Sequence, residues 1–187
     1  MSSQRIQAIE PPYPEDLQAS FDVVMPPGAP PLTLFRTVAQ NPRVLSRMVR
    51  GGLLDRGSIS LADRELVILR ACGVCKSEYE WGVHAAIFVE KAGFSEEQVG
   101  ASWTGDYEGA GFTDSQRLLL RLVDELHESS TVSDDLWRGL AAVYDDDQLV
   151  ELVMLAGLYH AVSFMTNALK IEKEAFGRPV PVSSTAP

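Results

Sequence analysis

Residues 61–95, LADRELVILRACGVCKSEYEWGVHAAIFVEKAGFS, contain both cysteines of the chain, one of its three histidines and several carboxylates. The first half, from Ala62 to Cys75, is apolar on nearly every side, which is typical of a buried helix. Ser77 and Glu80 then fit a capping box at the start of a second helix. The stretch therefore predicts two helices that meet at a corner.

The polar side chains of this stretch are spaced so that they can meet. Glu65 and Cys72 lie on one face of the first helix, two turns apart, and Glu80 and His84 stand at positions i and i+4 of the second. A carboxylate inside so apolar a helix needs a partner or a raised pKa. If the two helices fold back on each other, the candidate catalytic residues Glu65, Cys72, Cys75, Glu80 and His84 converge on one pocket.

Each member of this group also has a purely structural interpretation. Glu80 can act as a helix cap, and Cys72 and Cys75 can act as small hydrophobic residues. His84 taken alone is an ordinary core or surface histidine. Glu65 is the hardest to explain structurally, so the hypothesis of a site depends on the group and not on any single residue.

The rest of the chain predicts further helices and no convincing strand, so the predicted fold class is all-α. A long apolar helix is expected from Gln148 to about Glu174, as a buried spine or as a seam between subunits. Four residues are placed to cap other helices: Asn41, Ser60, Thr113 and Ser133.

Proline content divides the chain into three parts. Residues 1–31 contain seven prolines, which forbid a continuous helix, and they are expected to form an extended arm that wraps a surface. Residues 32–175 form the helical domain. Residues 176–187 are expected to be a loose tail.

Composition excludes several classes of partner. The chain has 16 basic and 26 acidic residues in 187, a net charge of −10, and no basic patch that would predict a nucleic-acid partner. No run approaches the roughly 20 apolar residues of a membrane span. The N-terminus lacks the apolar region of a signal peptide, and two closely spaced cysteines suit a reducing compartment. We expect a cytoplasmic protein.

The stretch RELVILRACGVCKSEYEWGVHAAIFVEKAGFS resembles the core motif of the carboxymuconolactone decarboxylase superfamily, which includes the alkylhydroperoxidase D-like proteins. The likeness spans roughly residues 30–172, and it implies an alkylhydroperoxidase D-like helical bundle that assembles as a trimer or hexamer. Further segments resemble helices of that family: residues 34–37 with 41–42, residues 124–127 and residues 159–169.

The peroxidase branch of that family has a glutamate twelve residues before the first cysteine of the motif C-x-x-C-x-x-x-H. Aligned on His84, the glutamate corresponds to Glu65, whereas the two cysteine positions hold Ser77 and Glu80. The C-x-x-C of this chain lies five residues upstream. The resemblance thus implies a shared glutamate and histidine with a displaced cysteine pair.

Three functions remain open. The first is thiol-dependent reduction of a hydroperoxide through Cys72 and Cys75, with Glu65 and His84 assisting and a thiol reductant as partner. The second is cofactor-free acid–base decarboxylation or isomerisation of a small carboxylated lactone or oxo-acid by His84 and Glu65. The third is a non-catalytic binding protein on the same fold. The candidate substrate-binding residues are Tyr79, Tyr159 and His160.

Neither a cofactor nor a metal is expected. Zinc would have only Cys72, Cys75 and His84 as ligands, without a second cysteine or histidine pair at metal spacing. The expected partners are a small-molecule substrate and further copies of the chain.

Overall fold

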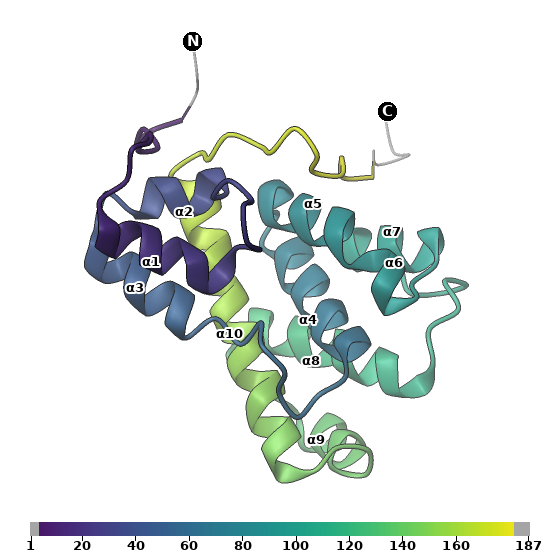
Figure 1. Ribbon diagram of the computed structural model, residues 1–187. Coiled ribbons are helices and arrows are strands. Elements are labelled where there is room, and N and C mark those ends of the chain that lie inside the picture. Colours follow the sequence, from purple (N-terminus) through teal and green to yellow (C-terminus); the bar gives the residue numbers. More distant parts are fainter. Residues whose placement is uncertain (1–3, 182–187) are drawn as a thin grey trace.

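In the computed structural model, the described residues 4–181 form ten helices and no strand (Figure 1). The all-α prediction is confirmed. The helices are α1 (Glu15–Val24), α2 (Thr33–Val38), α3 (Pro42–Arg50), α4 (Leu61–Val74), α5 (Glu78–Ile87), α6 (Val89–Ala92), α7 (Glu96–Thr104), α8 (Asp114–Ser129), α9 (Asp134–Ala141) and α10 (Asp146–Ala168).

Helix α4 is the element around which the others pack. It contacts α5, α6, α7, α8 and α10, and every residue from Glu65 to Gly73 is buried. Figure 1 shows α1–α3 grouped on one side of α10 and α4–α8 on the other. The apolar character of α4 on all sides is therefore explained by neighbours on all sides.

The buried apolar side chains form two clusters. The larger cluster surrounds α4, α8 and α10, and the smaller one joins α1, α2 and α3 to Tyr79 and Val83 of α5. Helix α5 thus lies between the two clusters and is buried over most of its length. Polar residues of α5 that face this boundary are removed from bulk water.

Most of the predicted caps are confirmed. The capping box at Ser77 is wrong, because the Ser77 side chain makes no cap hydrogen bond and its hydroxyl pairs with that of Thr166 at 2.7 Å. Glu80 is therefore not used as a cap. The side chains that do accept from a backbone N–H three residues later are Asn41, Ser60, Thr113 and Ser133.

The sequence predicted an extended N-terminal arm, but part of the arm is helical. The stretch between Pro14 and Pro26 is free of proline and forms α1. Leu17 and Phe21, one turn apart, are buried in the smaller cluster, and α1 packs against α3. The arm therefore covers a surface of its own chain; residues 1–3 lie outside the described part.

The C-terminal segment is also more ordered than predicted. Helix α10 ends at Ala168, six residues before the expected end. In the predicted loose tail, Gly177 and Arg178 lie against α5, where the Arg178 N–H donates to the Gly82 carbonyl at 2.9 Å. A Cβ on Gly82 would lie 2.7 Å from the Arg178 carbonyl oxygen, so this approach requires glycine. Residues 182–187 lie outside the described part.

Among the described helices, α10 is the one long and apolar enough to cross a membrane, with 23 residues and a mean hydropathy of 1.6 in its most apolar window. Length and composition alone are weak evidence, because the core helix of a soluble protein shares them. Helix α10 packs against α4, α5, α8 and α9 and leaves Val150, Met154 and Phe164 exposed. An exposed apolar face suits a contact between subunits, and the oligomeric state stays a prediction.

The close approach of α4 and α7 yields a stability test. A Cβ on Gly73 would lie 2.5 Å from the Ser102 carbonyl oxygen and 3.1 Å from the Trp103 Cα. Backbone atoms cannot move aside cheaply, so we expect Gly73→Ala to lower the free energy of unfolding by about 1–3 kcal/mol in urea denaturation.

Gly157→Ala is the matched control, because that glycine also lies in a helix and a Cβ there would have no neighbour within 4 Å. This substitution should raise the free energy of unfolding by about 0.5–1 kcal/mol. Equal effects of the two substitutions would contradict the packing described for α4 and α7.

Candidate functional site

Glu65 of α4 and His84 of α5 form the buried centre of the candidate site. Glu65 Oε2 lies 2.7 Å from His84 Nδ1, and both side chains are shielded from solvent. Glu65 Oε1 accepts from Arg64 Nε at 3.0 Å and Nη2 at 2.8 Å. Arg64 Nη1 also donates to the Leu54 carbonyl at 2.8 Å. Both carboxylate oxygens of Glu65 are therefore paired, as burial of a charge requires.

The other ring nitrogen of His84 faces a phenol and a second carboxylate. His84 Nε2 lies 3.0 Å from the Tyr159 hydroxyl and 3.4 Å from Glu80 Oε1. The His84 and Tyr159 rings stand nearly perpendicular, with centroids 5.1 Å apart. Helices α4, α5 and α10 thus each contribute to one connected polar group inside an apolar core.

The surroundings of His84 favour its charged form. Burial by itself lowers the pKa of the imidazole, but hydrogen bonds and charges from Glu65 and Glu80 outweigh it and raise the pKa of His84 to about 9. A protonated ring donates from both nitrogens, so Nδ1 donates to Glu65 and Nε2 to the Tyr159 oxygen. Burial raises the pKa of Tyr159 well above its usual value, and its hydroxyl therefore keeps a hydrogen to donate.

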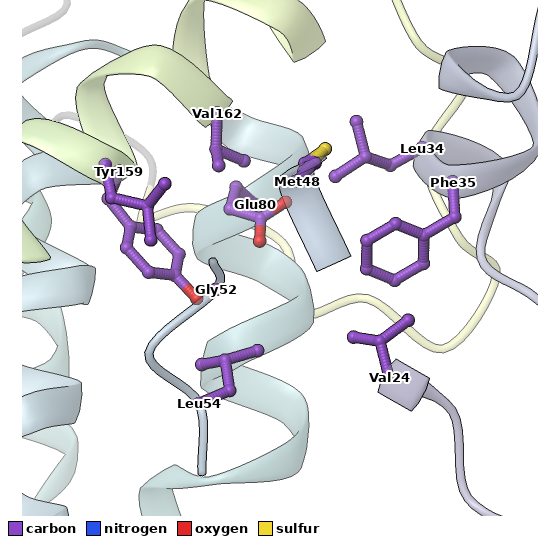
Figure 2. Close-up of a pocket in the computed structure, with 10 residues that line it drawn as sticks. Val24, Leu34, Phe35, Met48, Gly52, Leu54, Glu80, Tyr159 and Val162 are labelled. Carbon is purple, nitrogen blue, oxygen red and sulfur yellow. The ribbon is translucent and has the colours of Figure 1, made fainter. Parts of the chain in front are cut away.

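An apolar cavity of about 40 Å³ opens beside this group. Its walls come from α1, α2, α3, the segment after α3, and α10, and its lining includes the polar side chains of Glu80 and Tyr159. Figure 2 shows the Glu80 carboxylate between the Tyr159 ring on one side and Leu34 and Phe35 on the other. Glu80 Oε2 is buried and has no hydrogen-bond partner among the described residues.

A larger outer cavity of about 510 Å³ shares three lining residues with the inner one: Val24, Gly52 and Leu54. Arg50 and Asp55 lie on the wall of the outer cavity. The end of α1 and the segment 52–54 thus separate the inner cavity from a roomier space. They mark the path by which a small molecule would reach Glu80.

The two thiols do not line the inner cavity. Cys72 is fully buried; burial, and then the charge of Glu80, raise the pKa of its thiol well above the usual value. Cys75 is partly exposed at the end of α4, and burial again raises the pKa of its thiol, while the neighbouring Ser163 hydroxyl acts in the opposite direction. Glu65, His84 and Glu80 lie next to one another, but of the five residues predicted to converge on one pocket only Glu80 lines the inner cavity.

The predicted substrate-binding residues lie in three different places. Tyr159 faces the cavity, as described. The Tyr79 hydroxyl donates to Glu174 at 2.7 Å and accepts from the Leu34 N–H at 3.1 Å, and burial raises the pKa of this phenol well above its usual value. His160 is turned toward His127, with the two ring nitrogens 3.0 Å apart. Tyr79 and His160 therefore do not contribute to the inner cavity.

Arg64 is a member of the site that was not predicted from the sequence. Residues adjacent in a helix do not face each other, so an Arg–Glu dipeptide gives no reason to expect an ion pair. The sequence did offer one indication: Glu65 was expected to be buried and to need a partner, and Arg64 is the basic residue nearest to it in sequence.

Residues 42–119 match the Carboxymuconolactone decarboxylase family. No curated protein matches the chain in sequence.

Solved structures share the fold at low sequence identity. An uncharacterized peroxidase-related protein from Silicibacter sp. TM1040 is 16% identical with a TM-score of 0.76, over 94% of this chain and 96% of that chain. The alkylhydroperoxidase AhpD core of an uncharacterized peroxidase-related protein from Ralstonia eutropha JMP134 is 16% identical with a TM-score of 0.79, over 94% of each chain. The debrominase Bmp8, in complex with 2,3,4-tribromopyrrole, is 12% identical with a TM-score of 0.71, over 91% of this chain and 92% of that chain.

The charge state of His84 predicts how stability depends on pH. Folding raises the pKa of His84 above its unfolded value of 6.5, so the stabilisation is fully present below about pH 6.5 and is lost as the pH rises through about 9. A pKa shift of this size corresponds to roughly 3 kcal/mol of folding free energy. We expect the free energy of unfolding, measured in urea, to fall by up to this amount between about pH 6 and pH 10.

The His84→Asn variant supplies the reference for this measurement, because it keeps a side chain of similar size without the titrating ring. Its stability should be lower near pH 6 and should change less toward pH 10. Parallel pH profiles for the wild type and this variant would show that His84 is not charged in the folded protein.

Proposed function

We propose that this chain, which belongs to the carboxymuconolactone decarboxylase/alkylhydroperoxidase D-like superfamily, is an enzyme that moves protons on a small neutral substrate without a cofactor. The observation that carries the proposal is Glu80 Oε2, which is buried beside Tyr159 in the inner cavity and lacks a partner among the described residues. Leaving a buried carboxylate oxygen unpaired is unfavourable. A substrate hydrogen placed there would relieve that cost.

Each residue of the group has a role in such a reaction. Glu80 Oε2 removes a hydrogen from a carbon next to a carbonyl, as a general base. Tyr159 donates its hydroxyl hydrogen to the carbonyl oxygen, on which negative charge develops. His84 holds the phenol oxygen through Nε2–H, and Glu65 fixes the imidazolium. In a substrate whose α carbon is attached to a carbon–carbon double bond, Glu80 then returns the proton to the far end of the conjugated enolate, which completes an isomerisation with no net gain or loss of electrons.

The charges of the site favour a neutral substrate. Arg64 and His84 carry two positive charges, and Glu65 and Glu80 carry two negative charges, so the group is already balanced. The lining of the inner cavity contains no basic side chain, and a substrate carboxylate there would face Glu80. An enolisable ketone or lactone therefore suits this site better than the carboxylated substrates considered from the sequence, and isomerisation suits it better than decarboxylation.

The size of the inner cavity limits how the substrate enters. A volume of about 40 Å³ holds about three water molecules. A substrate of several heavy atoms needs the outer cavity as well, which requires displacement of Val24 or Leu54 at their common boundary. The reacting group of the substrate would then lie in the inner cavity and the remainder of the substrate in the outer cavity.

Proton abstraction can be tested before the natural substrate is known. We expect the wild-type protein to speed deuterium incorporation from heavy water into some members of a panel of small neutral ketones and lactones, followed by proton nuclear magnetic resonance. Glu80→Gln should lower that rate by about 10²–10⁴-fold, and Tyr159→Phe by about 10²-fold or more, because one removes the base and the other the hydrogen-bond donor.

Arg138→Gln is the matched control, since Arg138 is exposed on α9, where it donates to the Asp134 carbonyl and pairs with the Asp135 carboxylate. This variant should exchange at the wild-type rate. Carboxylated analogues of the same ketones should exchange more slowly than the neutral compounds. If Glu80→Gln incorporated deuterium at the wild-type rate, Glu80 could not be the general base.

Thiol-dependent hydroperoxide reduction is the second candidate, supported by one arrangement. The Ser163 hydroxyl lies beside both thiols, and Cys72 lies close enough to Glu80 and Tyr159 for their charges to interact. One thiolate would attack the hydroperoxide, which releases an alcohol and leaves a sulfenic acid. The second thiol would then displace water and form a disulfide. The raised pKa of both thiols opposes the first step.

A thiol titration separates the two candidates. After one equivalent of an organic hydroperoxide, we expect both thiols of the wild-type protein to remain free, because burial holds them in the unreactive protonated form. Loss of two thiols per chain, reversed by dithiothreitol and absent in Cys75→Ser, would instead establish a redox pair and make peroxide reduction the leading function.

A further inference from the structure

We propose that Cys75, His127 and His160 form a binding site for a zinc-type divalent transition-metal ion, separate from the inner cavity. These residues come from the end of α4, from α8 and from α10. The Cys75 Sγ and one ring nitrogen of each histidine all lie within 4.8 Å of one another. The site is independent of the proposed proton-transfer function, and it differs from the ligand set considered from the sequence.

The spacing of the two histidine nitrogens is close to what a tetrahedral ion needs. With zinc–nitrogen and zinc–sulfur bonds of about 2.0–2.1 and 2.3 Å, tetrahedral ligands lie about 3.3–3.6 Å apart. His127 Nδ1 and His160 Nε2 are 3.0 Å apart. If the exposed His127 side chain rotates so that its Nδ1 moves away by a few tenths of an ångström, the two nitrogens reach the required distance.

The nitrogen of His160 that faces the site is already in the required tautomer. His160 Nδ1 lies 2.8 Å from the Ala156 carbonyl oxygen, which can only accept, so Nδ1 carries the hydrogen and Nε2 carries a lone pair. A backbone carbonyl on the far nitrogen is the usual outer contact of a metal-bound histidine. On the sulfur side, Asn167 Nδ2 donates to the Cys75 carbonyl at 2.8 Å and holds the end of α4 in place.

A metal on His127 Nδ1 requires the other tautomer of that ring. In the absence of an ion its Nδ1–H donates to His160 Nε2; when a metal binds Nδ1, the hydrogen lies on Nε2 and the ring stays neutral. His84 is not part of this cluster, because its ring is buried between Glu65 and Tyr159.

The donor set and its exposure narrow the class of ion. One thiolate and two imidazoles suit zinc, cobalt or copper and do not suit magnesium or calcium, which prefer oxygen. Cys75 and His160 are partly buried and His127 is exposed, so the fourth position faces solvent. Three protein ligands with one open position are typical of sites that exchange or activate a bound water.

Metal binding is tested on the reduced full-length chain with Zn²⁺ alone and with Co²⁺ alone. We expect calorimetry to show one Zn²⁺ per chain, and Co²⁺ to produce a thiolate-to-metal absorption band. Cys75→Ser, His127→Asn and His160→Asn should each weaken Zn²⁺ binding by roughly a hundredfold or more, and Cys75→Ser should abolish the band.

Cys72→Ser is the matched control, because its thiol is buried and lies outside the cluster. This variant should keep both the stoichiometry and the band. A second readout uses alkylation mapped by mass spectrometry, in which Zn²⁺ should slow modification of Cys75 in the wild type but not in His160→Asn. Circular dichroism confirms that each variant is folded.

Three results would overturn the proposal. The first is the absence of both heat and absorption band at about tenfold excess of metal. The second is Zn²⁺ binding that is unchanged in His127→Asn and His160→Asn, which would mean that a thiol alone captures the ion. Equal loss of binding in Cys72→Ser would likewise refute the site as assigned, because the ion would then depend on the cysteine pair.

Discussion

The hydrogen bond between Glu65 and His84 is the contact on which the rest of the site depends. A carboxylate buried in α4 is tolerated because one oxygen meets the imidazole and the other meets Arg64. The same bond fixes the rotation of α5 against α4, so Glu80, one turn before His84, faces the inner cavity. Arg64 also holds the Leu54 carbonyl, which ties one wall of the cavity to the ion pair.

Local features of the sequence were sufficient for most of the helices and most of their caps, because each of these depends on neighbours in sequence. The Glu65–His84 pair joins two helices, and it was expected only if those helices fold back on each other. Contacts between distant segments were not predictable in this way. Ser77 leaves its predicted cap because Thr166, 89 residues later, offers its hydroxyl. Helix α4 is apolar on nearly every side, so its pattern cannot tell which face meets α5. The sequence therefore could not show that Cys72 and Cys75 stay outside the cavity.

Helix α10 explains why two polar groups lie close together without merging. Successive residues in a helix point about 100° apart, so Tyr159 faces His84 while His160 faces His127. One turn further, Ser163 lies beside both thiols. The last helix thus separates a closed acid–base group from a pair of histidines open to solvent, and it does so with two adjacent residues.

The position of Cys75 decides what the cysteine pair can do. Burial keeps its thiol protonated at neutral pH, which disfavours attack on a peroxide, whereas a metal ion deprotonates the thiol that binds it. A metal on Cys75 and a disulfide to Cys72 exclude each other, because both need the same sulfur. The acid–base group requires neither, since no cysteine lines the inner cavity among the described residues. A cysteine pair displaced from the family position is therefore compatible with proton-transfer chemistry in the cavity and with separate thiol chemistry beside it.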